Sequence, residues 1–418
     1  MRAVRQYPPY MSDINTFEIG PPHCKRKPKT MNSIIRRYLI ILSSTIMQVA
    51  FALGDAYGQP TDRLVDEFSI AVNGDLLLLP VAVDGDIHYF ALDTGSSTLV
   101  FDSSLRPKLG RFLRSVNATT PSGRRPVKCY ECAAELRLGS LRLNSANGVV
   151  CADLQVHTQG HTLAGLIGMD CLTDKIIEID FDNGKLRFLK SAGVERGHPV
   201  PLIWHQGRKT RDGPFAVVTV GRHGKGELLI DTGCTGPESG MLSGAVFKTL
   251  ADHGQIALVG DARSQEDVDE GQSDYVRGRV KQVSLTDIRH TDLVFRVTDT
   301  SALGLGFLSR HIVVFDFPNS VMFVRPGKRA DSPDIYDLSG MSVRRKGRIT
   351  LVYSVVQGSA AENAGIKRDD EIRSIDSTPV DRISIYDLRR LLCSAGLRTL
   401  TLMRDNREMK AQLRLAER

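Results

Sequence analysis

Two stretches of the sequence end in the same tripeptide, Asp-Thr-Gly, and each places an aspartate where an apolar run stops. Phe90-Ala91-Leu92 precedes Asp93, and Leu228-Leu229-Ile230 precedes Asp231. An apolar run bounded by glycine is typical of a buried strand that breaks into a tight turn. A carboxylate there is costly unless something satisfies it, so both aspartates are candidates for chemistry. Two copies after apolar triplets are much less expected by chance than one.

The elements that must position these aspartates belong to a repeated unit. After Asp93 come a hydrophobic-hydrophobic-glycine element at 166–168 and a strand at 176–181, whose following Asp-Asn-Gly turn predicts a β-hairpin. The same two features return at 302–304 and 312–317. Each feature and its later copy are separated by nearly as many residues as the two aspartates are, which indicates a duplicated domain. Frequent turns between short apolar runs predict that each unit is all-β.

Length and composition set broad limits. A chain of 418 residues suggests about three domains. With 41% hydrophobic and 25% charged residues it can bury ordinary cores. The formal charge of +7 is modest, and no basic face with interleaved aromatics appears, so nucleic acid is not an expected partner. Neither HExxH nor GxSxG occurs, which disfavours a metallopeptidase or a serine hydrolase.

Residues 1–58 resemble a targeting segment more than a folded domain. Arg36-Arg37 precede an apolar run at 38–53, and small residues at 50–52 have cleavage-site spacing. The run is short for a membrane span, so it predicts a signal peptide and an exported protein, periplasmic or extracellular. An uncleaved N-terminal anchor is the alternative, and it would be the chain's link to a membrane.

Six cysteines follow Cys24, and an oxidising compartment would permit disulfides without fixing their pairing. Cys129 and Cys132 have the spacing of half a metal or redox site, but no second half completes it. We therefore expect no metal and no cofactor.

A different pattern occupies 335–416. Two segments with helical features, at 358–365 and 385–393, alternate with short apolar runs that predict strands. About 80 residues of this kind are enough for a compact α+β module.

The duplicated unit resembles the aspartic peptidases, as two retropepsin-like lobes in one chain. The resemblance rests on the paired Asp-Thr-Gly stretches and on the later Leu-Ile-Gly and Ala-Leu-Gly elements, and it covers roughly 66–327. It implies a bilobal, mainly β fold with lobes at 66–190 and 198–327. Asp93 and Asp231 would face each other, share one proton and activate a water that attacks a peptide bond.

The resemblance also implies roles for residues beside the aspartates. Gly95 and Gly233 lack a Cβ, so backbone N–H groups can approach the carboxylates. Thr94 and Thr232 would hydrogen-bond across the lobe junction and lock the turns together, although β propensity alone could explain two threonines.

Two further features of the resemblance differ between the lobes. Ser96 matches the hydroxyl that braces the outer carboxylate oxygen, whereas Cys234 stands there in the second lobe and would either loosen Asp231 or form a disulfide. Tyr130 and Tyr275 are flap candidates, and each could equally be an ordinary strand residue.

The C-terminal module resembles a PDZ domain of the bacterial protease-associated type. Gly358-Ser359-Ala360-Ala361 and the later Asp370-Glu371-Ile372 carry the resemblance, while Asp369 and Ser377 replace glycines usual in the family. The resemblance implies a carboxylate-binding loop whose N–H groups cap a peptide C-terminus. That loop would be Leu338, Ser339, Gly340 and Met341. A purely structural module is the alternative.

Two functions follow from these resemblances. The first is an exported aspartic endopeptidase that cuts protein or peptide substrates at acidic pH and uses its PDZ module for recognition or regulation. The second is a peptide-binding scaffold whose protease-like lobes are inactive. Cleavage specificity, physiological substrate and oligomeric state are open at this point.

Overall fold

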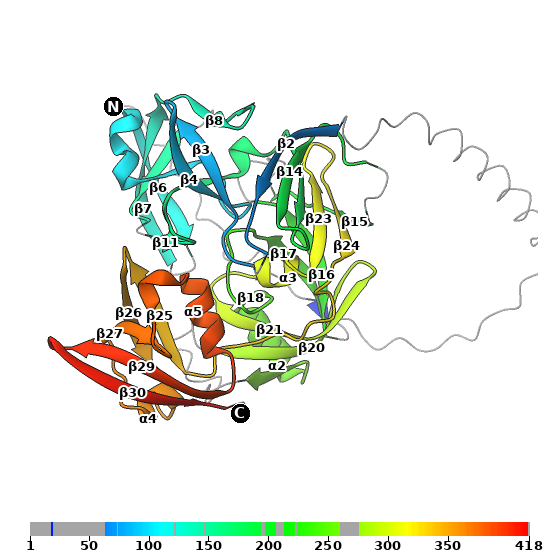
Figure 1. Cartoon of the computed structure of the whole chain (residues 1–418). Helices are drawn as coiled ribbons and strands as arrows, with labels where there is room; N and C mark the ends of the chain where they lie inside the picture. The colour runs from blue at the N-terminus through cyan, green and yellow to red at the C-terminus, as the bar shows by residue number, and fades with distance from the viewer. Residues whose placement is uncertain are drawn as a thin grey trace, which may run out of the picture.

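The computed structural model describes residues 18–19 and 63–416, apart from 73, 121–122, 146–147, 155, 194–196, 206–212, 222–223 and 260–275. This part of the chain is mainly β, as expected, and its strands form four sheets (Figure 1). The expected signal peptide lies outside the described residues. None of the helices within the described ranges is long and apolar enough to cross a membrane.

The first lobe is built on a ten-stranded sheet with the order β6-β7-β10-β5-β12-β4-β3-β8-β9, with β11 paired to β12. Its sheet is mixed, because β12 pairs in parallel with β4 and antiparallel with β5. The strands are β3 (Leu78–Val83), β4 (Asp86–Leu92), β5 (Val100–Asp102), β6 (Leu109–Thr120), β7 (Gly123–Cys132), β8 (Leu136–Leu138), β9 (Leu141–Arg142), β10 (Val149–Ala152), β11 (His157–Thr158) and β12 (His161–Ile167), with 3₁₀ turns η2 (Ser103–Lys108) and η3 (Met169–Cys171).

The second lobe repeats this plan on an eight-stranded sheet with the order β1-β17-β16-β20-β21-β18-β22, with β19 paired to β20. Helix α2 begins where the Ser243 hydroxyl accepts a hydrogen bond from Val246 N–H. The elements are β1 (Glu18–Ile19), β16 (Phe215–Val220), β17 (Gly224–Ile230), β18 (Gly240–Ser243), α2 (Gly244–Asp252), β19 (Ile256–Val259), β20 (Arg277–Leu285), β21 (Ile288–Thr298), β22 (Ala302–Leu303) and α3 (Leu305–Leu308).

A six-stranded sheet joins the lobes, in the order β15-β24-β23-β13-β14-β2. Strand β13 of the first half pairs antiparallel with β23 of the second, and the predicted hairpin forms between β13 and β14. The strands are β2 (Leu64–Ser69), β13 (Ile176–Asp180), β14 (Lys185–Leu189), β15 (His198–Pro201), β23 (His311–Asp316) and β24 (Val321–Pro326).

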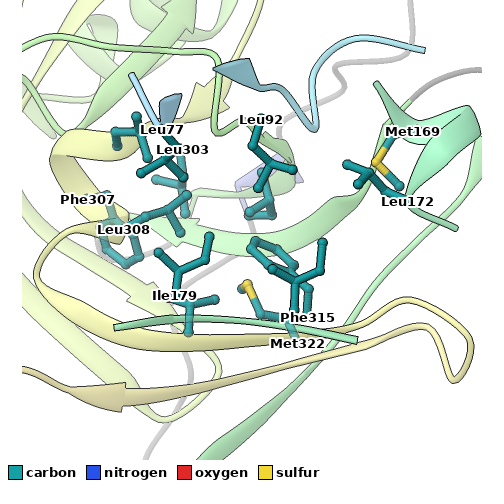
Figure 2. Packing of buried hydrophobic residues seen from close by; sticks show 14 of the residues in the cluster. Leu77, Leu92, Met169, Leu172, Ile179, Leu303, Phe307, Leu308, Phe315 and Met322 are labelled. Carbon is teal, nitrogen blue, oxygen red and sulfur yellow. The ribbon is translucent and has the colours of Figure 1, made fainter. Parts of the chain in front are cut away.

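One continuous hydrophobic core runs through both lobes and this joining sheet. Figure 2 shows its centre, where Leu92 and Leu303, from the two lobes, lie above Ile179 and Phe315 of the joining sheet. Leu92 directly precedes Asp93, so burial of apolar side chains fixes the strand end that carries the aspartate.

The C-terminal module forms a six-stranded sheet with the order β25-β26-β27-β29-β30, with β28 paired to β27. Helix α5 begins at Ser384, whose hydroxyl accepts from Asp387 N–H. The elements are β25 (Met341–Lys346), β26 (Ile349–Val355), α4 (Ala360–Asn363), β27 (Glu371–Ile375), β28 (Thr378–Pro379), η7 (Val380–Arg382), α5 (Ile385–Leu392), β29 (Gly396–Arg404) and β30 (Arg407–Leu415).

The module is packed against the second lobe. Val294 of β21 belongs to the module's hydrophobic core, and its N–H donates to Asp334 Oδ2 over 2.6 Å. Asp334 also forms a buried ion pair with Arg310. The core of the module therefore extends into the strand that lies beside the candidate site.

Candidate active site

The two aspartates lie at equivalent strand ends. Asp93 follows β4 and its N–H donates to Ile167 O of β12 over 3.0 Å. Asp231 follows β17 and its N–H donates to Leu303 O of β22, also over 3.0 Å. The hydrophobic-hydrophobic-glycine elements of the sequence thus act as the neighbouring strands that hold each aspartate in place.

Each carboxylate is held by N–H groups of its own turn. Gly95 N–H and Ser96 N–H donate to Asp93 Oδ1 over 2.9 and 3.0 Å. In the second lobe, Gly233 N–H donates over 2.8 Å to Oδ1 of the aspartate, and the N–H of the residue after it does so over 3.1 Å. One oxygen of each carboxylate is satisfied in this way, and the same oxygen is the one nearest the glycine of the opposite turn.

Thr94 and Thr232 form a reciprocal lock between the lobes. Each hydroxyl accepts from the backbone N–H of the other threonine over 3.0 Å. Thr94 Oγ1 donates to Ile230 O over 2.6 Å, and Thr232 Oγ1 donates to Leu92 O over 2.9 Å. Both side chains are fully buried. These four hydrogen bonds fasten the end of each strand to the opposite turn.

The glycines allow the two turns to approach each other. A Cβ on Gly95 would lie 2.6 Å from Asp231 Oδ1, and a Cβ on Gly233 would overlap Asp93 Oδ1. Any side chain at either position would therefore collide with the carboxylate of the other lobe. The two carboxyl groups are therefore close enough to affect each other's pKa.

Burial and mutual repulsion shift the titration of the pair. Burial, followed by the charge of Asp231, raises the pKa of Asp93 to about 8. Burial also raises the pKa of Asp231, while its turn N–H groups, Asp93 and Arg296 act in the opposite direction. Because the two carboxyls interact directly, their titration belongs to the pair and not to either residue alone. Two such carboxyls can hold one proton between them and serve as acid and base together.

The side chains after the two glycines do not play matching parts. Ser96 supports Asp93 through its N–H, but its hydroxyl donates to Thr98 O over 2.9 Å. Cys234 is a buried free thiol, and burial raises the pKa of that thiol to about 12. The disulfide considered for Cys234 is absent from this arrangement.

Arg296 of β21 is a residue of the site that sequence reasoning missed. Its Nη2 lies 3.3 Å from Thr235 O, 3.8 Å from Cys234 Sγ and 3.6 Å from Met241 Sδ. The one available signal was a cation inside the apolar run 293–297, and only the strand register reveals which turn it faces.

Of the two tyrosines considered for a flap, the structure describes one. Tyr130 lies on β7, is 8% exposed, and packs edge-on against Phe112 with the Arg106 guanidinium 3.9 Å from its ring centre. These contacts place it in the first lobe's core. Tyr275 lies outside the described residues.

The C-terminal loop at 338–341 has the expected N–H groups, and the chain itself occupies them. Ser339 and Gly340 N–H donate to Asp337 Oδ1 over 3.0 and 2.9 Å, and Met341 N–H donates to Ser339 Oγ over 3.1 Å. Leu338 N–H donates to Leu392 O at the end of α5. The N–H groups of this loop are thus bonded to Asp337, to Ser339 Oγ and to the end of α5.

Within the described ranges, no group of three or more His, Cys, Asp or Glu side chains is arranged to hold a metal ion.

Comparisons with known proteins agree with this geometry. Residues 79–171 match the family model for aspartyl protease, and residues 351–404 match the model for PDZ domain. No curated protein matches the sequence.

Two solved structures are similar in part. The aspartic proteinase from Irpex lacteus is 14% identical, with 64% of this chain and 100% of that chain covered and a TM-score of 0.42. The photosystem II D1 C-terminal processing protease is 24% identical, with 19% of this chain and 22% of that chain covered and a TM-score of 0.17. The chain thus spans less than a quarter of the latter protein. The family matches thus identify an aspartyl-protease segment at residues 79–171 and a PDZ domain at residues 351–404, which supports a protease-type function.

Proposed function

We propose that the chain is an aspartic endopeptidase whose catalytic pair is Asp93 and Asp231. The observation that carries the proposal is the convergence of the two carboxyls, each so close to the opposite turn that only glycine fits there. The raised pKa of Asp93 supports it as well, because a shared proton is what this chemistry requires.

The reaction needs a water between the two carboxyls. The ionised carboxylate takes a proton from the water while the water oxygen attacks the peptide carbonyl carbon. The protonated carboxyl donates its proton to the carbonyl oxygen. Collapse of the tetrahedral intermediate breaks the C–N bond, and the amine leaves with a proton. No acyl-enzyme forms, and no cofactor takes part.

Digestion of an unfolded protein across a range of pH tests the proposal. We expect pepstatin-sensitive cleavage in the wild type, with no cleavage in Asp93→Asn or Asp231→Asn. Normal turnover by either variant would exclude the assigned pair. If the folded wild type binds extended peptides yet leaves them intact at every pH, the inactive-scaffold alternative is correct.

Under the same proposal the PDZ domain recognises a peptide C-terminus after Asp337 is displaced. The occupied N–H groups of Ser339 and Gly340 support this order of events. Peptides ending in a free carboxylate should bind Asp337→Asn more tightly than wild type, and amidated peptides should bind neither. Equal, weak binding by both proteins would favour a structural role for the domain.

Export is part of the proposal and rests on the basic and apolar residues before 58. Cell fractionation followed by N-terminal sequencing tests it. A mature N-terminus shortly after the apolar run would support cleavage, an intact N-terminus in the membrane fraction would support an anchor, and a cytosolic protein would exclude export.

A further inference from the structure

The strand registers show that Arg296 occupies the same position in the second lobe as a very different residue in the first. In the first lobe, Val100 of β5 pairs with Leu166 on one side and Val150 on the other. In the second lobe, Met241 of β18 pairs with Ala302 and Arg296 in the same manner. Leu166 and Ala302 begin the matching hydrophobic-hydrophobic-glycine elements.

Arg296 is therefore the counterpart of Val150, which is 8% exposed and apolar. A cation replaces an aliphatic side chain at one of two equivalent positions. Because the strands around both positions pair alike, the backbone gives no reason for the replacement. The reason has to lie in what the guanidinium contacts.

Those contacts belong to the turn that carries Asp231. Arg296 Nη2 lies within hydrogen-bond reach of Thr235 O and close to Cys234 Sγ, one residue earlier. In the first lobe the turn is braced from within, by the Ser96 hydroxyl donating to Thr98 O. The second lobe has a thiol in place of that hydroxyl, and a thiol is a weak donor. Arg296 supplies the missing donor from the neighbouring strand.

A buried carboxylate offsets the charge of the guanidinium. Glu238, which is 5% exposed, pairs with Arg277 over 2.6 Å, and Arg277 stands directly opposite Arg296 in the β20–β21 pair. Two opposed cations would repel each other without such an anion. The charges of Arg277 and Arg296 hold the pKa of Glu238 below its ordinary value, so the anion persists at acidic pH.

We propose that Arg296 is a positioning residue of the catalytic pair: with its charge offset by Glu238, it braces the Asp231 turn and biases the shared proton toward Asp93. This inference rests on the proposed function but extends it, because it gives the two carboxyls unequal roles. Among the residues that the structure describes, the groups that act on the Asp231 charge are Asp93 across the junction, the Cys234 thiol in its own turn and Arg296 on β21, with the Glu238–Arg277 pair beside Arg296.

The sign of the effect follows from the charge. Arg296 lowers the pKa of Asp231, so its removal raises that pKa. The acidic limb of the kcat/KM profile reports ionisation of the base in the free enzyme and should therefore move to higher pH. A move of about one unit lowers kcat/KM about tenfold at a fixed pH on that limb.

The test compares Arg296→Met, Arg296→Lys and Arg289→Met. Arg289 is exposed on the same strand and serves as the matched control. We expect the acidic limb to move upward in Arg296→Met, to move less in Arg296→Lys, which keeps the charge, and to stay in place in Arg289→Met. An unchanged limb in a folded Arg296→Met protein would overturn the proposal.

A second measurement does not depend on activity. In the Asp93→Asn background Asp231 titrates alone, and infrared difference spectra against the Asp93→Asn, Asp231→Asn double variant isolate its carboxyl band. Adding Arg296→Met, or Arg296→Lys if the methionine variant fails to fold, should raise the Asp231 pKa, with the smaller rise for lysine. Identical titrations would refute the inference. If the Arg296 substitution raises the Asp231 pKa but the wild-type protein cuts no peptide, the proposed function alone is refuted.

Discussion

The two halves of the site share their threonine and glycine contacts and differ in the group that braces each turn. Thr94 and Thr232 exchange the same hydrogen bonds in both directions, and Gly95 and Gly233 make the same close approach. Beside this symmetry, the first turn is braced from within and the second by a cation from β21. The symmetric contacts bring the carboxyls together, and the asymmetric ones distinguish them. Duplication thus supplies the geometry, while later divergence supplies the difference in charge.

The largest expected effect comes from removing either carboxylate. Asp93→Asn and Asp231→Asn should each lower kcat by about 10⁴-fold or more, because a pair that acts as a unit fails when one member is lost. Steady-state cleavage of a fluorogenic peptide measures this. Retention of activity in one variant alone would mean that the halves are not partners.

The same Asp93→Asn variant should unfold less readily at neutral pH. The pKa of Asp93 is raised from 3.8 to about 8, so the unfolded chain loses this proton first as pH rises and stability falls across that window. Asparagine removes the dependence. Urea unfolding at several pH values gives the free energy of unfolding of wild type and variant as a function of pH. The two curves should coincide below pH 3.8 and separate above it. A constant difference at every pH would contradict the raised pKa.

A methyl group at either glycine should be the next most damaging change. Gly95→Ala places a Cβ against Asp231, and displacement of a reacting group by about 1 Å costs about 10²-fold in rate. Gly233→Ala should be similar because the approach is mutual. Gly244→Ala, where a Cβ meets nothing within 4 Å, is the control for both. A harmless Gly95→Ala would show that the turns are farther apart.

Loss of one threonine hydroxyl should weaken the fold equally from either side. Thr94→Val and Thr232→Val each leave a buried carbonyl and a buried N–H unpaired, and each should lower the free energy of unfolding by about 2–4 kcal/mol. Thr94→Ser retains the hydroxyl and should lose much less. Strongly unequal losses for the two valine variants would contradict a reciprocal lock.

The smallest expected effect comes from making the second turn resemble the first. Cys234→Ser keeps an acceptor near Arg296 Nη2 and adds a better donor, so kcat/KM should change by no more than about threefold. Peptide cleavage and thermal unfolding check this together. A severe loss of activity would assign the thiol a role of its own.

Much of the fold could be predicted from sequence because its signals are local. The apolar triplets before Asp93 and Asp231, the later glycine elements and the Asp-Asn-Gly hairpin each depend on a few consecutive residues. Because these features recur in the same order, they implied the duplicated plan. The family matches to aspartyl protease and PDZ domain confirm the two resemblances.

The rest depends on pairing between distant strands. Arg296 enters the site only because β21 pairs with β18 in one register, and a shift of one residue would turn its side chain to the other face. Tyr130 was a flap candidate by distance along the chain, whereas its ring packs against Phe112. Asp337 is an exception, because its carboxylate accepts from N–H groups two and three residues later in a local Asx turn that sequence reasoning missed.

The joining sheet also governs when the two carboxyls can meet. Strand β13 must find β23, and each turn is fastened by a threonine 138 residues away along the chain. Contacts between such distant segments form slowly because a long loop has to close first. A nascent chain that ends at β14 carries one aspartate and lacks its counterpart. Under the proposed function, the pair that cuts peptide bonds is therefore complete only after the second half of the polypeptide has been made.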